Sequence, residues 1–349
     1  MTKDARAELI RHCGALLLFA VLLRFIISYG PMLLQKAVSI ASTPAYISFL
    51  YYLNTGQILR IQDFPEQNET SKNDIVLRFR DLPPAEEPEK PTPLKEPAKK
   101  QELSFSQEEA EEIVISGNCK LPYDKDALLH AELPNITLSE QPTVLIVHTH
   151  ASESYAEEPG WEYQESDTYR TLDQNHSVVR LGAVIAEILE SHGIAVIHDT
   201  TVNDYPSYNG SYGRMETIIS DYLAKYPSIE MVLDVHRDAF ELADGTFGGT
   251  AVDGTAQIML VVGTNEGGLY HPNWQDNLSF ALKLDGLLNR ENPNLSKGIR
   301  LCTQRYNTHL TPRSVLVEFG AAGDTMQEAL RAADAFGAVL SDLLLASVE

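Results

Sequence analysis

The chain has 349 residues, of which 44% are hydrophobic, so it can bury a sizeable core over at least part of its length. Lysine and arginine total 27 against 49 aspartates and glutamates, a formal net charge of −22. That balance argues against a nucleic-acid binder, because phosphate contacts need a basic face. Three cysteines, Cys13, Cys119 and Cys302, exclude a dense disulfide scaffold and a cysteine-only zinc ribbon, and leave a Cys119–Cys302 pair open.

The N-terminal region carries the first apolar run. Residues 14–27 contain a single charge, Arg24, and apolar character resumes over residues 31–34. The stretch approaches the roughly 20 residues needed to cross a bilayer, although Arg24 also allows a buried helix. Basic residues precede it and no small-residue cleavage site follows directly. We expect residues 1–35 to be a cytoplasmic tail and a retained transmembrane anchor, with the rest of the chain outside the cytoplasm.

A composition change marks the next boundary. Residues 36–81 hold short apolar runs whose order the sequence leaves open. Six of the 18 prolines then fall between Pro83 and Pro97, mixed with glutamate and lysine. Such a segment forms neither a regular helix nor a central strand. We therefore expect a linker over residues 82–118, followed by one domain over residues 119–349.

Short apolar runs alternate with helical periodicities downstream of residue 140. Strands are predicted at residues 142–148, 194–197, 231–235, 257–263, 299–303 and 314–318. Helices are predicted at residues 177–192, 213–225, 276–289 and 325–346. This alternation predicts a three-layer αβα domain with a mainly parallel or mixed central sheet.

Histidine and glutamate follow three of the predicted strands. His150 and Glu153 come after the first, His236 after the third, and Glu318 after the last. In open α/β sheets the functional site forms at the carboxyl ends of strands. Two imidazoles and one carboxylate are the ligand set of a catalytic zinc with an open position, here His150, Glu153 and His236. A separate carboxylate, Glu318, would serve as general base toward a water molecule.

Other residues near these apolar runs could have either a functional or a purely structural role. Five of them could support a ligand or contact substrate: His148, Arg237, Asn265, His271 and Arg305. A lone histidine is more often a cap or a satisfied core residue, and loop arginines more often pair with acids. His176, at an expected helix start, is a rival of Glu153 as third ligand.

Six segments of the chain resemble the stage II sporulation protein P family. They are VHTHASESY (147–155), DVHRDA (234–239), VGTN (262–265), HPNW (271–274), YNTHL (306–310) and VLVEFGAAGDT (315–325). The resemblance covers roughly residues 140–335, and the order and spacing of the motifs agree. These proteins are similar to zinc-dependent N-acetylmuramoyl-L-alanine amidases, so the resemblance implies an amidase/carboxypeptidase-like fold.

The resemblance also implies a function. It implies a peptidoglycan hydrolase that removes stem peptides from glycan and cleaves peptide cross-links in the septal wall during forespore engulfment. It implies Zn²⁺ as cofactor, the mother-cell membrane as location, and stage II sporulation proteins D and M as partners. His150 and His236 match the family's zinc histidines, and Glu318 matches its catalytic glutamate. Related amidases take the carboxylate ligand from a glutamate before the first long helix, where this chain has Asn175 and His176.

Two rivals remain at this point. A zinc carboxypeptidase acting on wall peptides would use the same ligands and would add a pocket for a free C-terminal carboxylate. A non-catalytic wall-binding scaffold would have no reason to keep His150, His236 and Glu318 together at strand ends.

Overall fold

The computed structural model describes residues 103–348. The predicted membrane anchor, the segment 36–81 and the proline-rich run lie outside these residues. Within the described part of the chain, no helix is long and apolar enough to span a membrane.

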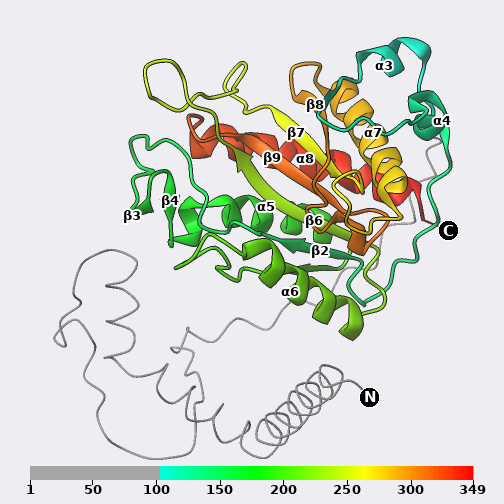
Figure 1. Ribbon diagram of the computed structural model, residues 1–349, viewed down its shortest axis with the longest axis horizontal. Coiled ribbons are helices and arrows are strands. Elements are labelled where there is room, and N and C mark those ends of the chain that lie inside the picture. Colours follow the sequence, from blue (N-terminus) through cyan, green and yellow to red (C-terminus); the bar gives the residue numbers. More distant parts are fainter. Residues whose placement is uncertain (1–102, 349) are drawn as a thin grey trace, which may run out of the picture. The chain divides into compact units, whose positions relative to one another are not determined.

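Between residues 103 and 348, nine strands alternate with helices along the chain. Figure 1 shows their arrangement. The strands are β1 (Ile115–Gly117), β2 (Val144–Val147), β3 (Glu165–Asp167), β4 (Arg170–Thr171), β5 (Val196–His198), β6 (Met231–Asp238), β7 (Ile258–Gly263), β8 (Ser296–Cys302) and β9 (Val315–Ala321). The α-helices are α3 (Gln107–Glu112), α4 (Lys125–His130), α5 (Val178–Ser191), α6 (Ser211–Lys225), α7 (Trp274–Glu291) and α8 (Met326–Ala346), and two short 3-10 helices are η2 (Gln174–His176) and η3 (Thr308–Leu310).

Seven strands form one mixed sheet in the order β1-β8-β7-β9-β6-β2-β5. Strands β5, β2, β6 and β9 are parallel neighbours, and so are β7, β8 and β1. The two blocks meet at β7 and β9, which are antiparallel. The carboxyl ends of β2, β6 and β9 therefore lie at one edge of the sheet, and those of β7 and β8 at the opposite edge.

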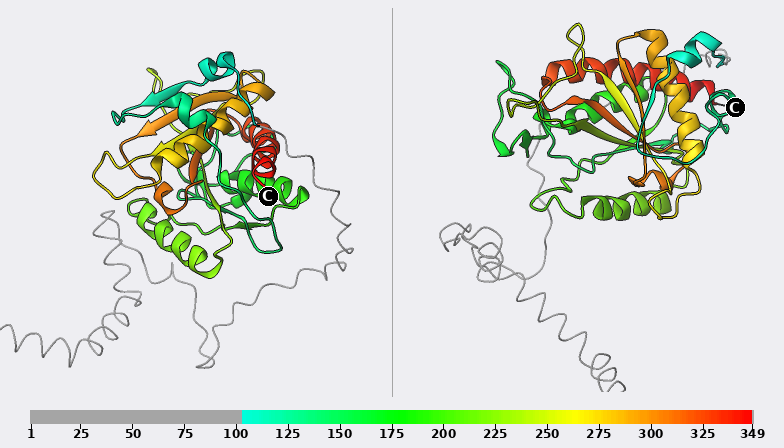
Figure 2. Two further views of the ribbon diagram at one scale, coloured as in Figure 1. Left: turned by 90° about the vertical axis from the view of Figure 1, so that its right-hand side faces the viewer. Right: turned by 45° about the horizontal axis from the view of Figure 1, so that its top comes forward.

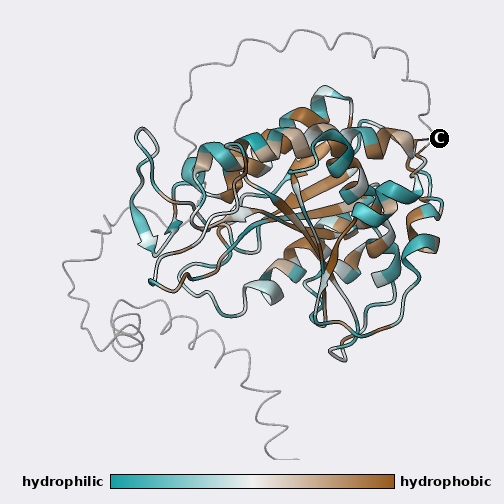
Figure 3. Cartoon of the chain, turned by 90° about the horizontal axis from the view of Figure 1, so that it is seen from above, coloured by the Kyte–Doolittle hydropathy of each residue, from teal (hydrophilic) through white to brown (hydrophobic). Residues whose placement is uncertain are grey.

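Helices cover both faces of the sheet, which confirms the predicted three layers (Figure 2). The main core joins α5, α7 and α8 to one face, where Leu233 and Val235 of β6 point. Helix α6 packs on the other face through a smaller cluster that includes Val232. Because strand side chains alternate between faces, Asp234 and His236 share the α6 face with Val232. The central strands are almost uniformly apolar and the helices are polar on their outer sides (Figure 3).

The domain and two of its strands extend beyond their expected limits. Residues 103–118, predicted as part of the linker, contain α3 and β1, and Phe105 and Ile113 are buried in the main core. Strand β6 continues past Val235 to Asp238 and β9 past Glu318 to Ala321, because the two strands remain paired there. The side chains of His236 and Glu318 therefore project from within strands. Cys119 and Cys302 are free thiols.

Asp285 in α7 offers a test of the core. It is fully buried, accepts hydrogen bonds from Ser296 Oγ and from Asn289 Nδ2, and burial raises its pKa from 3.8 to about 6. The folded state therefore keeps the carboxyl neutral at pH values where the unfolded chain ionises it. The stability that this group contributes is full below pH 4 and is lost as the pH rises through 6.

We expect Asp285→Asn to raise the free energy of unfolding at pH 7 by roughly 1–3 kcal/mol and to have little effect at pH 4. Urea denaturation at both pH values measures this. Asp342→Asn, at an exposed position of α8, is the matched control. An equal effect of Asp285→Asn at pH 4 and pH 7 would contradict the account.

Candidate metal and catalytic site

Parallel pairing brings the predicted site residues together. His236 of β6 lies directly opposite Glu318 of β9 in the sheet register. His150 and Glu153 lie in the turn that follows β2, the other parallel neighbour of β6. The Glu153 backbone N–H donates to His150 O at 3.1 Å, and Glu153 O accepts from Val178 N at the start of α5. The turn is thus fixed by its own backbone and by the helix that it leads into.

Glu153 and His236 are in direct contact. Glu153 Oε2 lies 3.2 Å from His236 Nδ1 and accepts the Arg237 backbone N–H at 3.3 Å. His236 Nε2 lies 2.9 Å from Asp234 Oδ1, but the two are not aligned as a hydrogen bond, and Nε2 has no such partner among the described residues. Asp234 is held by the Thr149 backbone N–H at 2.8 Å and the Thr149 hydroxyl at 2.6 Å.

Burial and charge set the protonation of these groups. Burial opposes the charged form of His236, but the carboxylates of Asp234 and Glu153 outweigh it and hold the His236 pKa well above its usual range. Burial also disfavours ionised Glu153, yet His236 and Arg237 lower its pKa. Burial lowers the pKa of His150 to about 4, so its imidazole is neutral at pH 7. The neutral imidazole of His150 and the ionised carboxylate of Glu153 are the forms that bind metal ions, whereas His236 would release its proton on binding one.

Glu318 lies beside this pair and is half-buried. Its Oε2 atom is buried and has no hydrogen-bond partner among the described residues, which is rare for a buried polar atom. Burial, together with the charges of Glu153 and Asp238, raises the pKa of Glu318 to about 8, with His236 acting in the opposite direction. Such a group can accept and release a proton near neutral pH.

Aromatic rings surround His150. Tyr208 stacks on it with ring centroids 4.3 Å apart and an angle of 8°. Tyr212, at the start of α6, meets it edge-on at 5.5 Å and lies parallel to His236 at 6.5 Å. The rings of His150 and His236 are 5.4 Å apart and nearly perpendicular. These contacts leave each imidazole little rotational freedom.

Arg170 of β4 ties the turn to the loop before α6. Its guanidinium bonds Asp204 Oδ2 at 2.7 Å and Ser152 Oγ at 3.0 Å, and lies 3.4 Å from Glu153 Oε1. It also covers the ring of Tyr208 at 4.9 Å. One cation therefore neutralises two buried carboxylates and orders the residues around His150.

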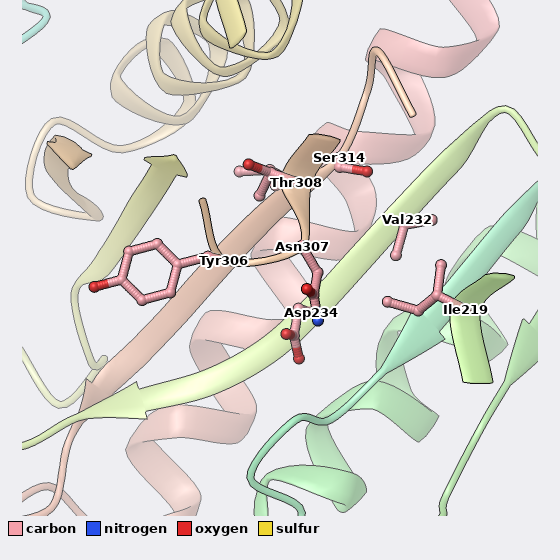
Figure 4. A pocket seen from close by; sticks show the side chains of 8 residues that line it. Ile219, Val232, Asp234, Tyr306, Asn307, Thr308 and Ser314 are labelled. Carbon is pink, nitrogen blue, oxygen red and sulfur yellow. The ribbon is translucent and has the colours of Figure 1, made fainter. Parts of the chain in front are cut away.

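A small pocket lies behind Asp234. It is lined by Asp234 and by residues 306–308 and 314–315, among others. Asn307 extends toward Asp234, whereas Tyr306 points away from the pocket (Figure 4). The Asn307 amide donates to Tyr212 O at 2.8 Å, which fastens this segment to α6.

The side chains present suit a zinc ion in their chemistry. Two ligands of one tetrahedral zinc are about 3.4 Å apart, given bond lengths near 2.0–2.1 Å. The separation of Glu153 Oε2 and His236 Nδ1, 3.2 Å, agrees with that spacing. As they stand, however, no three His, Cys, Asp or Glu side chains of residues 103–348 are grouped to hold a metal ion.

Comparison with known proteins identifies the family. The stage II sporulation protein P family model matches residues 52–341. The chain belongs to the stage II sporulation protein P family. Stage II sporulation protein P of Bacillus subtilis (strain 168) is 29% identical over 223 residues, which are 60% of this chain and 53% of that protein. The chain thus matches about half the length of this family member.

Solved structures of amidases are more remote. Ami1 of Mycobacterium abscessus has a TM-score of 0.38 and 13% identity over 59% of this chain and 98% of that chain. The amidase AmiC2 of Nostoc punctiforme has a TM-score of 0.33 and 11% identity over 58% and 95% of the two chains. A structural similarity of this degree carries no argument about the chemistry of this chain.

Two residues predicted to support a ligand or contact substrate, His148 and Arg237, instead make contacts that hold the fold together. His148 faces away from the site: its Nδ1 lies 3.2 Å from Val235 O and its Nε2 lies 2.8 Å from His198 Nε2. Arg237 donates to the backbone oxygens of Ser154 and Tyr169 at 2.8 and 2.9 Å. Its guanidinium thereby orders the segment around Glu153. The Arg237 backbone N–H also donates to the Glu153 carboxylate.

Three other predicted residues are not brought to the site, because β7 and β8 run opposite to β9. Asn265 follows β7 at the far edge of the sheet and is exposed, so its expected place on the catalytic face is wrong. His271 lies 3.0 Å from Thr308 Oγ1, and Arg305 pairs with Glu216 at 2.9 Å. The antiparallel junction could not be recognised from apolar runs alone.

The rival ligand His176 lies beside the Glu153 segment, but its side chain has other partners. Its Nδ1 is 2.9 Å from Asp173 Oδ2, and its ring packs near those of Trp161 and Tyr163. Its backbone carbonyl accepts a hydrogen bond from the Ser154 hydroxyl. In this geometry Glu153, and not His176, contacts His236.

Several residues of the site were not recognised in the sequence: Arg170, Asp204, Tyr208, Tyr212 and Asp234. Only Asp234 carried a usable signal, since a residue two positions before His236 in a strand shares its face. The others come from loops and from the start of α6, and only the tertiary fold brings them together.

The Arg170 contacts give a stability prediction. Arg170→Gln leaves Asp204 and Glu153 buried without this cation, so we expect a loss of about 3 kcal/mol in the free energy of unfolding. Urea denaturation of the variant measures it. Arg331→Gln, at an exposed position of α8, is the control, and a loss no greater than that of the control would count against the role given to Arg170.

Proposed function

We propose that this chain is a membrane-anchored, zinc-dependent peptidoglycan hydrolase, acting as an N-acetylmuramoyl-L-alanine amidase and as an endopeptidase on peptide cross-links. Family membership supports a role in sporulation and in septal wall remodelling during engulfment. The proposal includes a catalytic domain outside the mother-cell membrane and partnership with stage II sporulation proteins D and M.

One observation carries the catalytic proposal. Glu318 presents a buried carboxyl oxygen without a hydrogen-bond partner in residues 103–348, directly across the register from His236, which itself contacts Glu153. A carboxyl on a paired strand, with one oxygen left unpartnered by the described residues, is placed to exchange a proton with a reacting molecule. A residue serving only the fold would have its oxygens satisfied.

His150, Glu153 and His236 would hold the zinc ion. The chemistry that the ion supplies when bound is Lewis acidity, which polarises the amide carbonyl and lowers the pKa of water. Glu318 takes a proton from the attacking water while the water oxygen bonds to the amide carbon. When the C–N bond breaks, Glu318 returns that proton to the leaving nitrogen. Arg237 and Arg170 keep Glu153 ionised and in place.

Glu318→Gln tests the general base. The variant keeps the size of the side chain and its place in β9 but removes the basic oxygen, so we expect digestion of purified peptidoglycan to fall by at least a hundredfold. We expect bound zinc to stay at the wild-type level.

The digestion products distinguish the proposal from its rivals. Free stem peptides and unlinked cross-bridges are expected from the wild-type chain. Release of single C-terminal residues alone would indicate a zinc carboxypeptidase. Binding of peptidoglycan with no product from either the wild type or Glu318→Gln, in a folded chain, would leave a non-catalytic scaffold.

A further inference from the structure

Two cations lie near Glu318 that the catalytic proposal does not use. Arg300 of β8 points away from the main core, since its neighbours Ile299 and Leu301 are buried there. It is on the same face of the sheet as Glu318 and its side chain is 41% exposed. The Lys297 side chain is 35% exposed on the same strand.

A β-bulge places both cations on one face. In the pairing of β7 with β8, Ile258 is opposite Ser296 and Met259 is opposite Gly298, so Lys297 is an extra residue. Residues three apart in a regular strand point to opposite faces of the sheet. The extra residue shifts this alternation by one, so Lys297 and Arg300 point to the same face. Gly298 permits it with a φ of +92°.

The contacts of the two side chains confirm this placement. Arg300 Nη2 lies 3.5 Å and Lys297 Nζ 3.8 Å from the same atom, Asp238 Oδ2. Asp238 stands at the end of β6, two residues beyond His236. Two cations share one carboxylate at long range, so the group keeps an excess positive charge in a chain whose net charge is −22.

A second irregularity lies on the other side of Glu318. His236 is opposite Glu318 but Asp238 is opposite Ala321, so β9 also carries an extra residue, next to Gly320. Bulges are over-represented beside active sites, where they re-aim side chains. Both bulges of the sheet around Glu318 therefore shape the surface that leads from it to Asp238, Lys297 and Arg300.

Strand spacing sets the distance. Strand β8 is separated from β9 by β7 alone, and neighbouring strands are about 4.8 Å apart. Through Val261, Arg300 aligns with Leu316, two residues before Glu318, so the backbones of Arg300 and Glu318 are roughly 12 Å apart. An extended peptide rises about 3.3 Å per residue, so a carboxylate held by Arg300 is about three or four residues from the bond at Glu318.

We propose that Lys297 and Arg300 form a carboxylate subsite, which binds a free carboxylate of the wall peptide and sets its register at Glu318. This inference rests on the proposed function, since it names the part of the substrate that the same site recognises. Guanidinium and ammonium groups bind carboxylates through charge-assisted hydrogen bonds, and the partial exposure of both side chains leaves donors free for the ligand.

The test compares two forms of one ligand: soluble disaccharide-peptide fragments of peptidoglycan with free carboxyl groups, and the same fragments with these groups converted to carboxamides. We expect the wild-type full chain to bind the carboxylate form about tenfold more tightly, measured by calorimetry. The double variant Lys297→Gln/Arg300→Gln is expected to lose this preference, and Arg300→Lys to keep part of it. Lys225→Gln removes one exposed charge at the far end of α6 and is the control for net charge.

Hydrolysis gives a second readout. For the carboxylate form we expect the double variant to raise KM with kcat largely kept, since the subsite holds the peptide and not the reacting atoms. Equal wild-type binding of both forms, or the same loss of preference in Lys225→Gln, would overturn the subsite. Binding preference without any hydrolysis would sink the catalytic proposal and leave the subsite standing.

Discussion

The contact between Glu153 and His236 is the interaction on which the site depends. Burying a carboxylate and an imidazole is costly unless each is paired, and here each meets the other at 3.2 Å. Asp234 and Arg237, both from β6, complete the charge balance on either side. Because β6 is the central partner of β2 and β9, its residues draw the turn after β2 and Glu318 into one place. The antiparallel junction at β7 then places Asn265 at the opposite end of the sheet, whereas the loop after β8 reaches back to the site through Asn307, which bonds Tyr212.

Much of the fold could be predicted from local patterns. The four long helices and six core strands lie close to their predicted positions because each has an apolar face or run of matching period. The pattern failed at short or polar elements. Strand β1 has only one partly buried apolar residue, Ile115, and forms because β8 offers an unpaired edge. The direction of β7 was not predictable either, since an apolar run reads the same in parallel and antiparallel pairing.

The site was predictable to the extent that its residues belong to strands. His236 and Glu318 share a face because both alternate with core residues, and neither needed the structure to be noticed. The spacing from His150 favours Glu153 over His176 as the third ligand, and in the structure Glu153 is the residue that contacts His236. The roles of Arg170 and Tyr208 could not be predicted, since they arise from loops folded over His150. The face to which Lys297 points could not be predicted either, because a bulge reverses the expected alternation.

The most direct test of the account is the zinc content of the purified chain and of two variants, Glu153→Gln and His176→Gln. We expect one zinc per wild-type chain, and at least a tenfold weaker zinc affinity in Glu153→Gln, since the amide is a much poorer ligand than the carboxylate. His176→Gln is expected to bind zinc as the wild type does. Loss of zinc from His176→Gln with retention in Glu153→Gln would contradict the central role of the Glu153–His236 pair.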